Sequence, residues 1–465
     1  MKHITDYING IFSKDEGKKI FLLAAPLTGT ALVNMGMSIT DTLMMGWMGS
    51  IPLAAGAVVS DLYSIVFYFM SGILATVAAI LAQALGRNNH DEITDVMRNG
   101  FHAAMMLALP AFVIVWNIDL VLMAFGIDAS VISLGSEYAK QMAFTTVAML
   151  GVAVWRNVFS AFGKPRIFLM MVLAALPLNA LLNYVFMFGK LGMPELGLAG
   201  AGFSSALVAF AMMAGFTIYA SRDVEISKYI PYGNFLHINR EGISEIFRIG
   251  VPSGMTTLGN VGIYLISTPI ISLFGPEALA AHAIALRLAG VVYAIPVGLS
   301  QAATVRTGYN VGKNDNEAVG NVKRTAIAMA TVSGIACFSI LAVTSEILPA
   351  LFLPNGGEAT AIAATLIIFL GAINFAEYPN VVAGGILRGF KDTRTPMIYT
   401  LVGYWAIGAP IMAMMAGTAG HGAEGVWFGL LVGVYATATL ILGRLFAPDF
   451  TNKNFTKNAV GVAAE

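Results

Sequence analysis

The ionisable side chains that lie deep within apolar stretches of the sequence are few: Asp41, Asp61, Arg287 and Glu377. A charge at depth in a membrane is costly and normally faces an interior cavity, where it binds an ion, a proton or a polar partner. A carboxylate in such a place can lose its charge to a cation or proton and regain it on release. These residue types therefore indicate ion or proton binding within a membrane protein.

Asp41 has polar companions at a similar depth. It lies about 10 Å from the end of the first apolar segment, at a rise of 1.5 Å per residue. Asn183, Asn179 one helical turn away, and Ser205 lie at a comparable depth from the same side. All can offer oxygen atoms, which suits Na⁺ or a proton-carrying carboxylate with neutral partners. The alternative is a polar cluster that only joins helices through hydrogen bonds.

The composition identifies the elements that must hold these residues. Of 465 residues, 57% are hydrophobic and 11% are charged, and the mean hydropathy is +0.76. A spanning helix needs about 20 apolar residues. Twelve long apolar segments, too long for barrel strands, predict an all-α integral membrane bundle. They run roughly 19–48, 53–84, 98–122, 131–158, 166–189, 197–220, 246–275, 279–309, 321–346, 358–387, 396–416 and 423–448.

Other chemistries have no support in the sequence. Its single cysteine, Cys337, excludes a disulfide framework or a cysteine-based metal site. No metal-spaced His/Glu cluster, nucleophile elbow, phosphate-binding loop or dinucleotide fingerprint is present, so we expect no enzyme and no cofactor beyond a transported ion. The net charge is zero, and nothing indicates a nucleic-acid partner.

Lysine and arginine set the orientation. They concentrate on the side that carries the N-terminus and the 221–245 connection, which predicts that both termini are cytoplasmic. The expected parts are a cytoplasmic N-terminal segment (1–18), two six-helix lobes (19–220 and 246–448), an inter-lobe linker (221–245) and a cytoplasmic tail (449–465).

The two halves repeat. At a shift of 226 residues Pro26 falls on Pro252, LAAGA (53–57) falls on LAAHA (279–283), and the loop Gly-Arg-Asn (86–88) falls on Gly-Lys-Asn (312–314). Each half has an even number of helices, so the repeats are parallel and pseudo-symmetric, a design that places the substrate between the halves.

Several stretches together resemble the multidrug and toxic compound extrusion (MATE) family, in its bacterial NorM-like branch. They are Pro26 with TDTLMMGWMG (40–49), PLNALLNYVFMFG (177–189), PELGLAGAGFSSA (194–206) and NVVAGGILRGFKDTR (380–394). The resemblance covers roughly residues 17–448.

The resemblance implies a function. Such a protein exports cationic or amphipathic drugs and toxic compounds in exchange for inward H⁺ or Na⁺, by alternating access. It implies a monomer in the bacterial inner membrane, surrounded by lipids. It also implies that Asp41, Asn179, Asn183 and Ser205 form the cation-coupling site of the first lobe, with Na⁺ possible at the first three.

The second lobe departs from the family pattern. The position at which NorM-like members carry a glutamate is Asn260 here, and the acid of the tenth helix is Glu377. A carboxylate with an amide binds a bare cation more weakly than two carboxylates do, so a second Na⁺ site is in doubt. Glu377 is expected either to act in coupling or drug contact or to be a buried hydrogen-bonded acid.

Two further pairs are equivalent under the repeat. Pro26 and Pro252 each free a backbone carbonyl and permit a helix kink, static or mobile. Asp61 and Arg287 lie at equal depth, about 12 Å from the outer surface. Their opposite charges suggest an ion pair between the lobes; the alternative is a partner for each within its own half.

One other transporter function stays open at this point. A flippase for lipid-linked precursors belongs to the same wider superfamily, but handling a pyrophosphate needs several cavity cations. Arg287 is the one clearly deep arginine in the sequence, which favours drug efflux.

Overall fold

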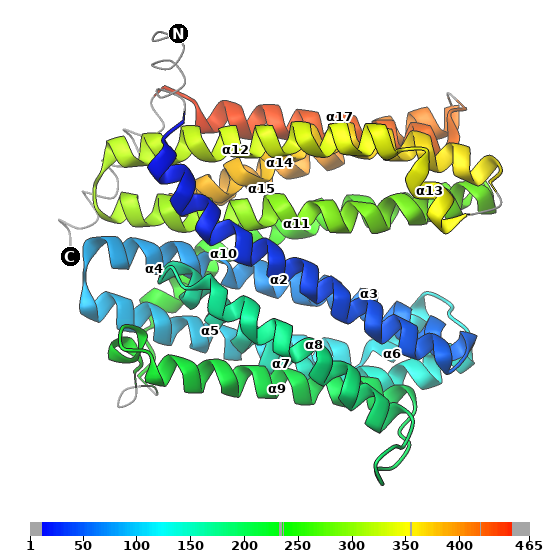
Figure 1. Ribbon diagram of the computed structural model, residues 1–465, viewed down its shortest axis with the longest axis horizontal. Helices are drawn as coiled ribbons and strands as arrows, with labels where there is room; N and C mark the ends of the chain where they lie inside the picture. The colour runs from blue at the N-terminus through cyan, green and yellow to red at the C-terminus, as the bar shows by residue number, and fades with distance from the viewer. Residues whose placement is uncertain (1–11, 232–234, 236, 354–355, 419, 449–465) are drawn as a thin grey trace. The chain divides into compact units, whose positions relative to one another are not determined.

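The computed structural model describes residues 12–231, 235, 237–353, 356–418 and 420–448, and every regular element in this part of the chain is a helix (Figure 1). The α-helices are α2 (Lys14–Trp47), α3 (Ser50–Leu74), α4 (Thr76–Arg87), α5 (His90–Trp116), α6 (Ile118–Ala124), α7 (Ala129–Ala161), α8 (Pro165–Met187), α9 (Leu198–Arg222), α10 (Arg240–Ser272), α11 (Pro276–Gly312), α12 (Asn316–Thr344), α13 (Ile347–Phe352), α14 (Glu358–Gly389), α15 (Arg394–Thr400), α16 (Ala409–Ala413) and α17 (Gly422–Leu445). A 3₁₀ turn, η1 (Ile226–Tyr229), and two π-helical stretches, η2 (Leu401–Gly408) and η3 (Met414–Thr418), complete the set.

The predicted helical membrane protein is confirmed. Each of the twelve apolar segments coincides with one helix or with consecutive helices. Within the described residues, eleven helical runs are long and apolar enough to cross a membrane. The twelfth segment is α10, a long helix whose mean hydropathy is lower because polar residues such as Ser253, Asn260 and Ser267 interrupt it.

Three segments differ in detail from single α-helices, the third because it is interrupted at Asn117 between α5 and α6. The second is split at Ala75 into α3 and α4. The eleventh alternates between α and π geometry over α15, η2, α16 and η3. A π stretch inserts extra residues per turn and changes the direction of the side chains that follow, and such stretches often occur at functional sites.

The sequence repeat is present in the backbone. Asn88 and Asn314, 226 residues apart, both adopt the left-handed conformation after a helix, with φ of 54° and 58°. The residues that follow, Asn89 and Asp315, each accept a hydrogen bond from the backbone N–H three residues later, at 3.2 and 2.9 Å. Two helix–turn–helix connections are thus built alike, with the same caps.

Internal contacts divide the chain into two compact units. Unit N is Gly29–Gly254, and unit C is Met255–Glu465 together with Met1–Thr28. Both boundaries fall two residues after a proline, Pro26 or Pro252, and they differ by the repeat shift of 226. Helices α2 and α10 each begin in one unit and end in the other, so the units and the predicted lobes divide the chain differently. The lobe boundaries and the kinks at the prolines stay predictions.

Close backbone packing explains why the first turns of α2 belong to unit C and the first turns of α10 belong to unit N. In unit C, a Cβ on Gly298 of α11 would lie 2.9 Å from the carbonyl oxygen of Ala24 and against Thr28 of α2. In unit N, a Cβ on Gly250 or Gly254 of α10 would lie 2.7–2.8 Å from a carbonyl oxygen of α3. Only glycine allows these approaches, and Thr28 and Gly254 are repeat equivalents.

Unit N is organised around α7, which packs against α3, α4, α5, α8 and α9. Its aromatic core includes Trp155, Phe159, Phe168 and Phe216, with the last two rings stacked at 4.9 Å. The first part of the predicted linker is docked on this unit. Ile226 of η1 is fully buried, and the Tyr229 ring contacts the rings of His90 and Phe162.

Unit C is organised around α14, which packs against α11, α12 and α17. A buried ion pair fastens the start of α2 to this unit: Arg306 donates to both carboxylate oxygens of Glu16, at 2.5 and 2.9 Å. The backbone N–H of Ser13 also donates to Thr325 at 3.1 Å. Breaking a buried pair by removing one partner leaves an uncompensated charge, so this contact holds α2 firmly.

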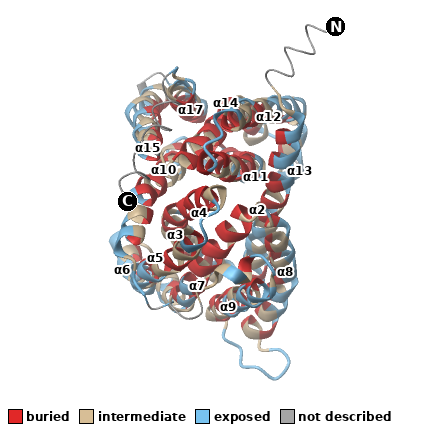
Figure 2. Ribbon diagram, turned by 90° about the vertical axis from the view of Figure 1, so that its left-hand side faces the viewer, coloured by how far each residue is buried: buried red, intermediate tan, exposed pale blue. Residues whose placement is uncertain are grey.

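Large apolar side chains cover much of the outer surface. Leu109, Met170, Leu191 and Phe125 are between 68% and 82% exposed. In Figure 2 the short helix α13 carries mainly exposed residues. Soluble proteins rarely expose contiguous apolar surface on this scale, whereas a lipid-facing surface requires it.

Candidate functional site

Asp41 is the centre of a polar cluster in unit N. Its Oδ1 accepts two hydrogen bonds, from Nδ2 of Asn179 and Nδ2 of Asn183, both at 2.6 Å. The two asparagines lie one turn apart on α8 and so share a helix face. Both amides are fully buried, whereas Asp41 is half-buried. The three residues that the sequence places at one depth are thus in direct contact.

The cluster keeps unused oxygen atoms. No described residue donates to Oδ2 of Asp41, and Oδ1 of Asn183 is buried without a hydrogen-bond partner. A buried hydrogen-bond acceptor without a donor costs about 1–3 kcal/mol of folding free energy. Oδ1 of Asn183 is therefore expected to gain a partner in another state of the protein. The free oxygens are the atoms that a proton or a cation would bind.

Tyr138 extends the cluster to other helices. It lies on α7, interacts electrostatically with Asp41, and its hydroxyl is 3.2 Å from Ser60 Oγ of α3. Ser205 is the fourth residue that the sequence predicts for this site. It lies half-buried on α9, and among the described residues no hydrogen bond links it to Asp41. A role for Ser205 in coupling stays a prediction.

A second buried carboxylate lies in unit C. Oε2 of Glu377 on α14 accepts hydrogen bonds from the Tyr404 hydroxyl at 2.8 Å and from Nδ2 of Asn380 at 3.1 Å. Tyr404 belongs to the π-helical stretch η2, and its side chain is fully buried. Glu377 is 3% exposed. Glu377 is thus a buried, hydrogen-bonded acid in this structure, and both of these bonds are accepted by the same oxygen. A role in coupling or drug contact stays a prediction.

Asn260 belongs to the same polar region of unit C. A side-chain hydrogen bond joins it to Tyr293 of α11, and Tyr293 and Tyr264 both interact electrostatically with Glu377. Oδ1 of Asn260 is buried without a hydrogen-bond partner. Helices α10, α11, α14 and η2 therefore bring one carboxylate, two amides and three phenols together.

The sequence reasoning missed the tyrosines. Tyr138, Tyr264, Tyr293 and Tyr404 line the two carboxylate clusters, and none was a candidate. A tyrosine in an apolar helix carries a hydroxyl that needs a partner when buried, and this signal was available. Which of the chain's 15 tyrosines meet a carboxylate depends on helix packing.

Asp61 and Arg287 lie in different units. Asp61 is on α3 of unit N, where it interacts electrostatically with Tyr68. Arg287 is on α11 of unit C, and both side chains are exposed. Their predicted pairing stays a prediction.

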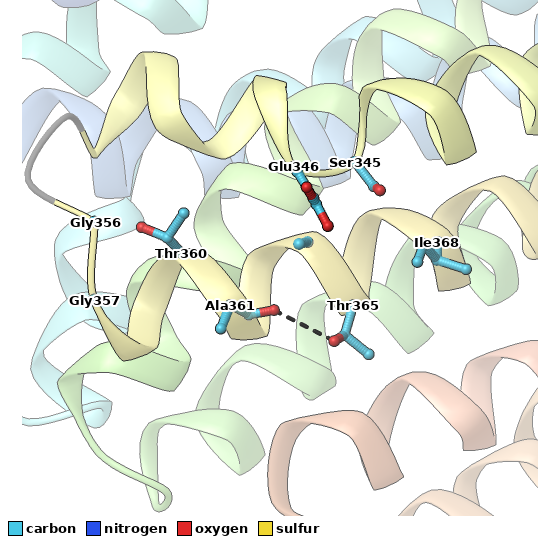
Figure 3. Close-up of a pocket in the computed structure, with 9 residues that line it drawn as sticks. Ser345, Glu346, Gly356, Gly357, Thr360, Ala361, Thr365 and Ile368 are labelled. Atoms are coloured by element: carbon cyan, nitrogen blue, oxygen red, sulfur yellow. Dashed lines mark hydrogen bonds between the residues drawn. The ribbon is translucent and has the colours of Figure 1, made fainter.

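A surface pocket of unit C lies away from the Glu377 cluster. It has a volume of about 490 Å³ and is lined by residues at the end of α12 and the start of α14, among them Glu346, Thr360 and Thr365 (Figure 3). Thr365 donates to the carbonyl oxygen of Ala361 at 3.3 Å. The pocket includes neither Asn260 nor Glu377, so it carries none of the chemistry of the carboxylate clusters.

Comparison with known proteins identifies the family. The MatE family model matches residues 26–185 and 252–414, once in each half of the repeat. The chain belongs to the MATE family. It is thus a multi-pass membrane transporter rather than an enzyme, and the resemblance noted in the sequence is confirmed.

Relatives agree along almost the whole chain. The probable multidrug resistance protein NorM of Agrobacterium fabrum is 33% identical over 92% of this chain and 93% of its own length. The protein of the same name from Mesorhizobium japonicum is 29% identical, over 94% and 95%.

Solved structures share the fold. A eukaryotic MATE transporter, AtDTX14, matches with a TM-score of 0.85 at 18% identity, over 95% of this chain and 98% of that one. The Vibrio cholerae MATE transporter VcmN in its bent form matches with a TM-score of 0.82 at 16% identity, over 96% and 98%.

Proposed function

We propose that this protein is a multidrug efflux antiporter that exports cationic or amphipathic compounds in exchange for an inward cation. The observation that carries the proposal is the Asp41 cluster: one carboxylate held by two buried amides, with oxygen atoms still free. The names of the NorM relatives support drug efflux as the activity.

Asp41 is the coupling group in this proposal. Its charge is cancelled when a proton or Na⁺ binds and restored when the ion leaves on the other side. The amide groups of Asn179 and Asn183 stabilise the charged form through charge-assisted hydrogen bonds. A binding cation competes with these bonds, so ion binding and the packing of α8 against α2 are linked. Alternating access follows if the ion-bound and ion-free arrangements of α2 and α8 open the transporter to opposite sides of the membrane.

The proposed coupling ion is H⁺, with Na⁺ as the alternative. Both amides present N–H donors to Asp41, which complement a carboxylate that gains and loses a proton. A bare Na⁺ would need amide oxygens instead, and Oδ1 of Asn183 is the one buried without a partner. A Na⁺ site would therefore require at least one amide to turn.

The Glu377 cluster is assigned a supporting role in the substrate cavity. The three phenols and two amides around this carboxylate can exchange hydrogen-bond partners without leaving its charge unsatisfied. This adaptability suits contact with varied cationic drugs. Asn260, in place of a second carboxylate, argues against a second cation site. Asn260→Ala is accordingly expected to lower efflux less than Asp41→Asn does.

The proposed location is the bacterial inner membrane with both termini in the cytoplasm. Four basic residues at the α7–α8 and α9–η1 ends would then face the cytoplasm, in line with the positive-inside rule: Lys164 just before α8, Arg166 in its first turn, Arg222 at the end of α9, and Lys228 in η1. The protein would act on small-molecule drugs as a monomer.

Reconstituted transport tests the proposal. Purified protein in liposomes is given either a pH gradient or a Na⁺ gradient alone, and uptake or release of a fluorescent organic cation is followed. Acceleration by the pH gradient alone supports H⁺ coupling, and acceleration by Na⁺ alone assigns Na⁺. No acceleration by either gradient, with protein shown to be folded, would contradict antiport.

A further inference from the structure

We propose that a groove between α8 and α9 in unit N binds one anionic phospholipid. The groove has a volume of about 560 Å³. It is lined by Met171 of α8, by Gly215, Ile218, Tyr219 and Arg222 of α9, and by Asp223 and Val224, which follow α9. It is separate from both carboxylate clusters, and no step of the proposed transport reaction uses it.

The lining residues of α9 form one continuous face. Gly215, Ile218, Tyr219 and Arg222 follow the three- and four-residue spacing that places side chains above one another on a helix. Arg222 is the last residue of α9, and the end of a spanning helix is where headgroups are expected. Gly215 is about 10 Å further along the helix at 1.5 Å per residue. The groove therefore runs from headgroup depth into the acyl region.

The polar end of the groove holds Arg222 and the carboxylate of Asp223, and of these two only Arg222 lacks an ion-pair partner among the described residues. The two acids after α9, Asp223 and Glu225, both pair with Lys164, at 2.6 and 3.2 Å. Arg222 is exposed and makes no ion pair or side-chain hydrogen bond with any described residue. A guanidinium binds a phosphate through two parallel hydrogen bonds, so Arg222 suits the phosphodiester of a lipid.

The Tyr219 side chain adds a second polar atom next to the charge. Its ring is held against Phe159, with centroids 5.8 Å apart, and its hydroxyl has no hydrogen-bond partner in the described chain. Tyrosine at this depth is typical of the membrane interface, where its hydroxyl reaches headgroup oxygens. Arg222 and Tyr219 together offer donors to a phosphate and to an ester carbonyl.

The deep end of the groove is apolar and open because of a glycine. A Cβ on Gly215 would lie 3.5 Å from Sδ of Met171, an ordinary contact distance. A Cβ would therefore fit there without moving the backbone, and the glycine leaves room that a longer side chain would take up. An acyl chain along Met171 and Ile218 is the occupant that this space suits.

Basic pockets between spanning helices on the cytoplasmic side are typical sites for anionic headgroups. The assignment to the cytoplasmic leaflet rests on the orientation proposed above, whereas the binding itself does not. A lipid in this groove would contact α8, the helix that carries Asn179 and Asn183, and so could influence the Asp41 cluster.

Native mass spectrometry of the purified full-length chain tests the site. The protein in detergent is titrated with phosphatidylglycerol or with phosphatidylcholine of the same acyl chains. We expect the first phosphatidylglycerol to bind at least about 10-fold more tightly. Arg222→Gln should remove this preference, because a charged hydrogen-bonded pair contributes on the order of 10-fold or more in affinity.

Matched variants separate the groove from general surface charge. Arg166→Gln removes another exposed cation near the start of α8 that does not line the groove, and it should leave the preference unchanged. Gly215→Leu should weaken binding of both lipids by filling the apolar end. Tyr219→Phe, which keeps the ring, should weaken phosphatidylglycerol binding about 3-fold for the loss of a single neutral hydrogen bond.

Several results would overturn the proposal. Equal affinity for the two lipids in the wild type would exclude an anionic site. An equal loss in Arg166→Gln and Arg222→Gln would indicate diffuse surface charge. Displacement of phosphatidylglycerol by glycerol 3-phosphate at equal concentration would show that a phosphate alone is recognised and that the groove holds no acyl chain.

Discussion

Replacing Asp41 with asparagine should abolish coupled efflux while leaving the protein folded. The new side chain has the same shape, and its Oδ1 can still accept the two amide hydrogen bonds now measured at 2.6 Å. Each bond changes from a charged one, contributing about 1.5–3 kcal/mol, to a neutral one of about 0.5–1.5 kcal/mol. The loss of a half-buried charge offsets part of this difference.

The net change in the free energy of unfolding is therefore expected to be small, about 1–2 kcal/mol at most. Transport should respond far more strongly, because a neutral amide cannot exchange a proton or bind Na⁺ through a charge. Efflux driven by a gradient should fall to the rate of protein-free liposomes. Asp91→Asn, which alters an exposed carboxylate in the first turn of α5, is the matched control and should transport normally.

A double-mutant cycle tests whether the asparagines act through Asp41. Asn183→Ala alone should reduce gradient-driven efflux, because it removes one of the two donors to the carboxylate. In the Asp41→Asn background the same change should have no further effect on transport. Wild-type efflux from Asp41→Asn at equal amounts of folded protein would refute the coupling role. Additive effects in the cycle would refute the link between the residues.

Three other outcomes are expected. Glu377→Gln should change the range of exported drugs without stopping efflux, since Tyr404 can still donate to the amide oxygen. An unchanged range for a panel of cationic dyes would favour a purely structural role for this acid. Burial alone would raise the pKa of Asp223, but hydrogen bonds from Lys164 and from two backbone N–H groups outweigh it and hold the pKa below its usual value. The docking of η1 should therefore be fully stabilised above about pH 4 and weaken as the pH falls through the lowered pKa. Hydrogen exchange of the Ile226 amide should show this loss in the wild type and not in Asp223→Asn. Gly298→Ala should lower the unfolding temperature, because overpacking against a carbonyl costs about 1–3 kcal/mol of folding free energy. The control Gly384→Ala, which has open space around its Cβ, should not lower it. Equal unfolding temperatures for the two variants would show that α2 and α11 can separate freely.

The sequence predicts much of the Asp41 site because helices translate residue number into depth. Asp41, Asn179 and Asn183 could be placed at one level from the ends of their apolar segments, and the turn between the two asparagines put them on one face. That reasoning could not decide rotation about each helix axis. Ser205 shares the depth of the cluster but makes no bond to Asp41, while Tyr138, which no depth argument selects, lies beside it.

Apolar length, the distribution of lysine and arginine, and the 226-residue repeat determined the class of this protein, because the membrane imposes the same constraint on every spanning segment. Even the paired left-handed caps at Asn88 and Asn314 follow from the repeat. Tertiary structure alone decided that α2 and α10 each contribute to two units, since this depends on backbone contacts at glycines such as Gly250. It also decided which tyrosines surround Glu377. Hydrogen-bond partners from distant helices are chosen by packing, which local sequence does not encode.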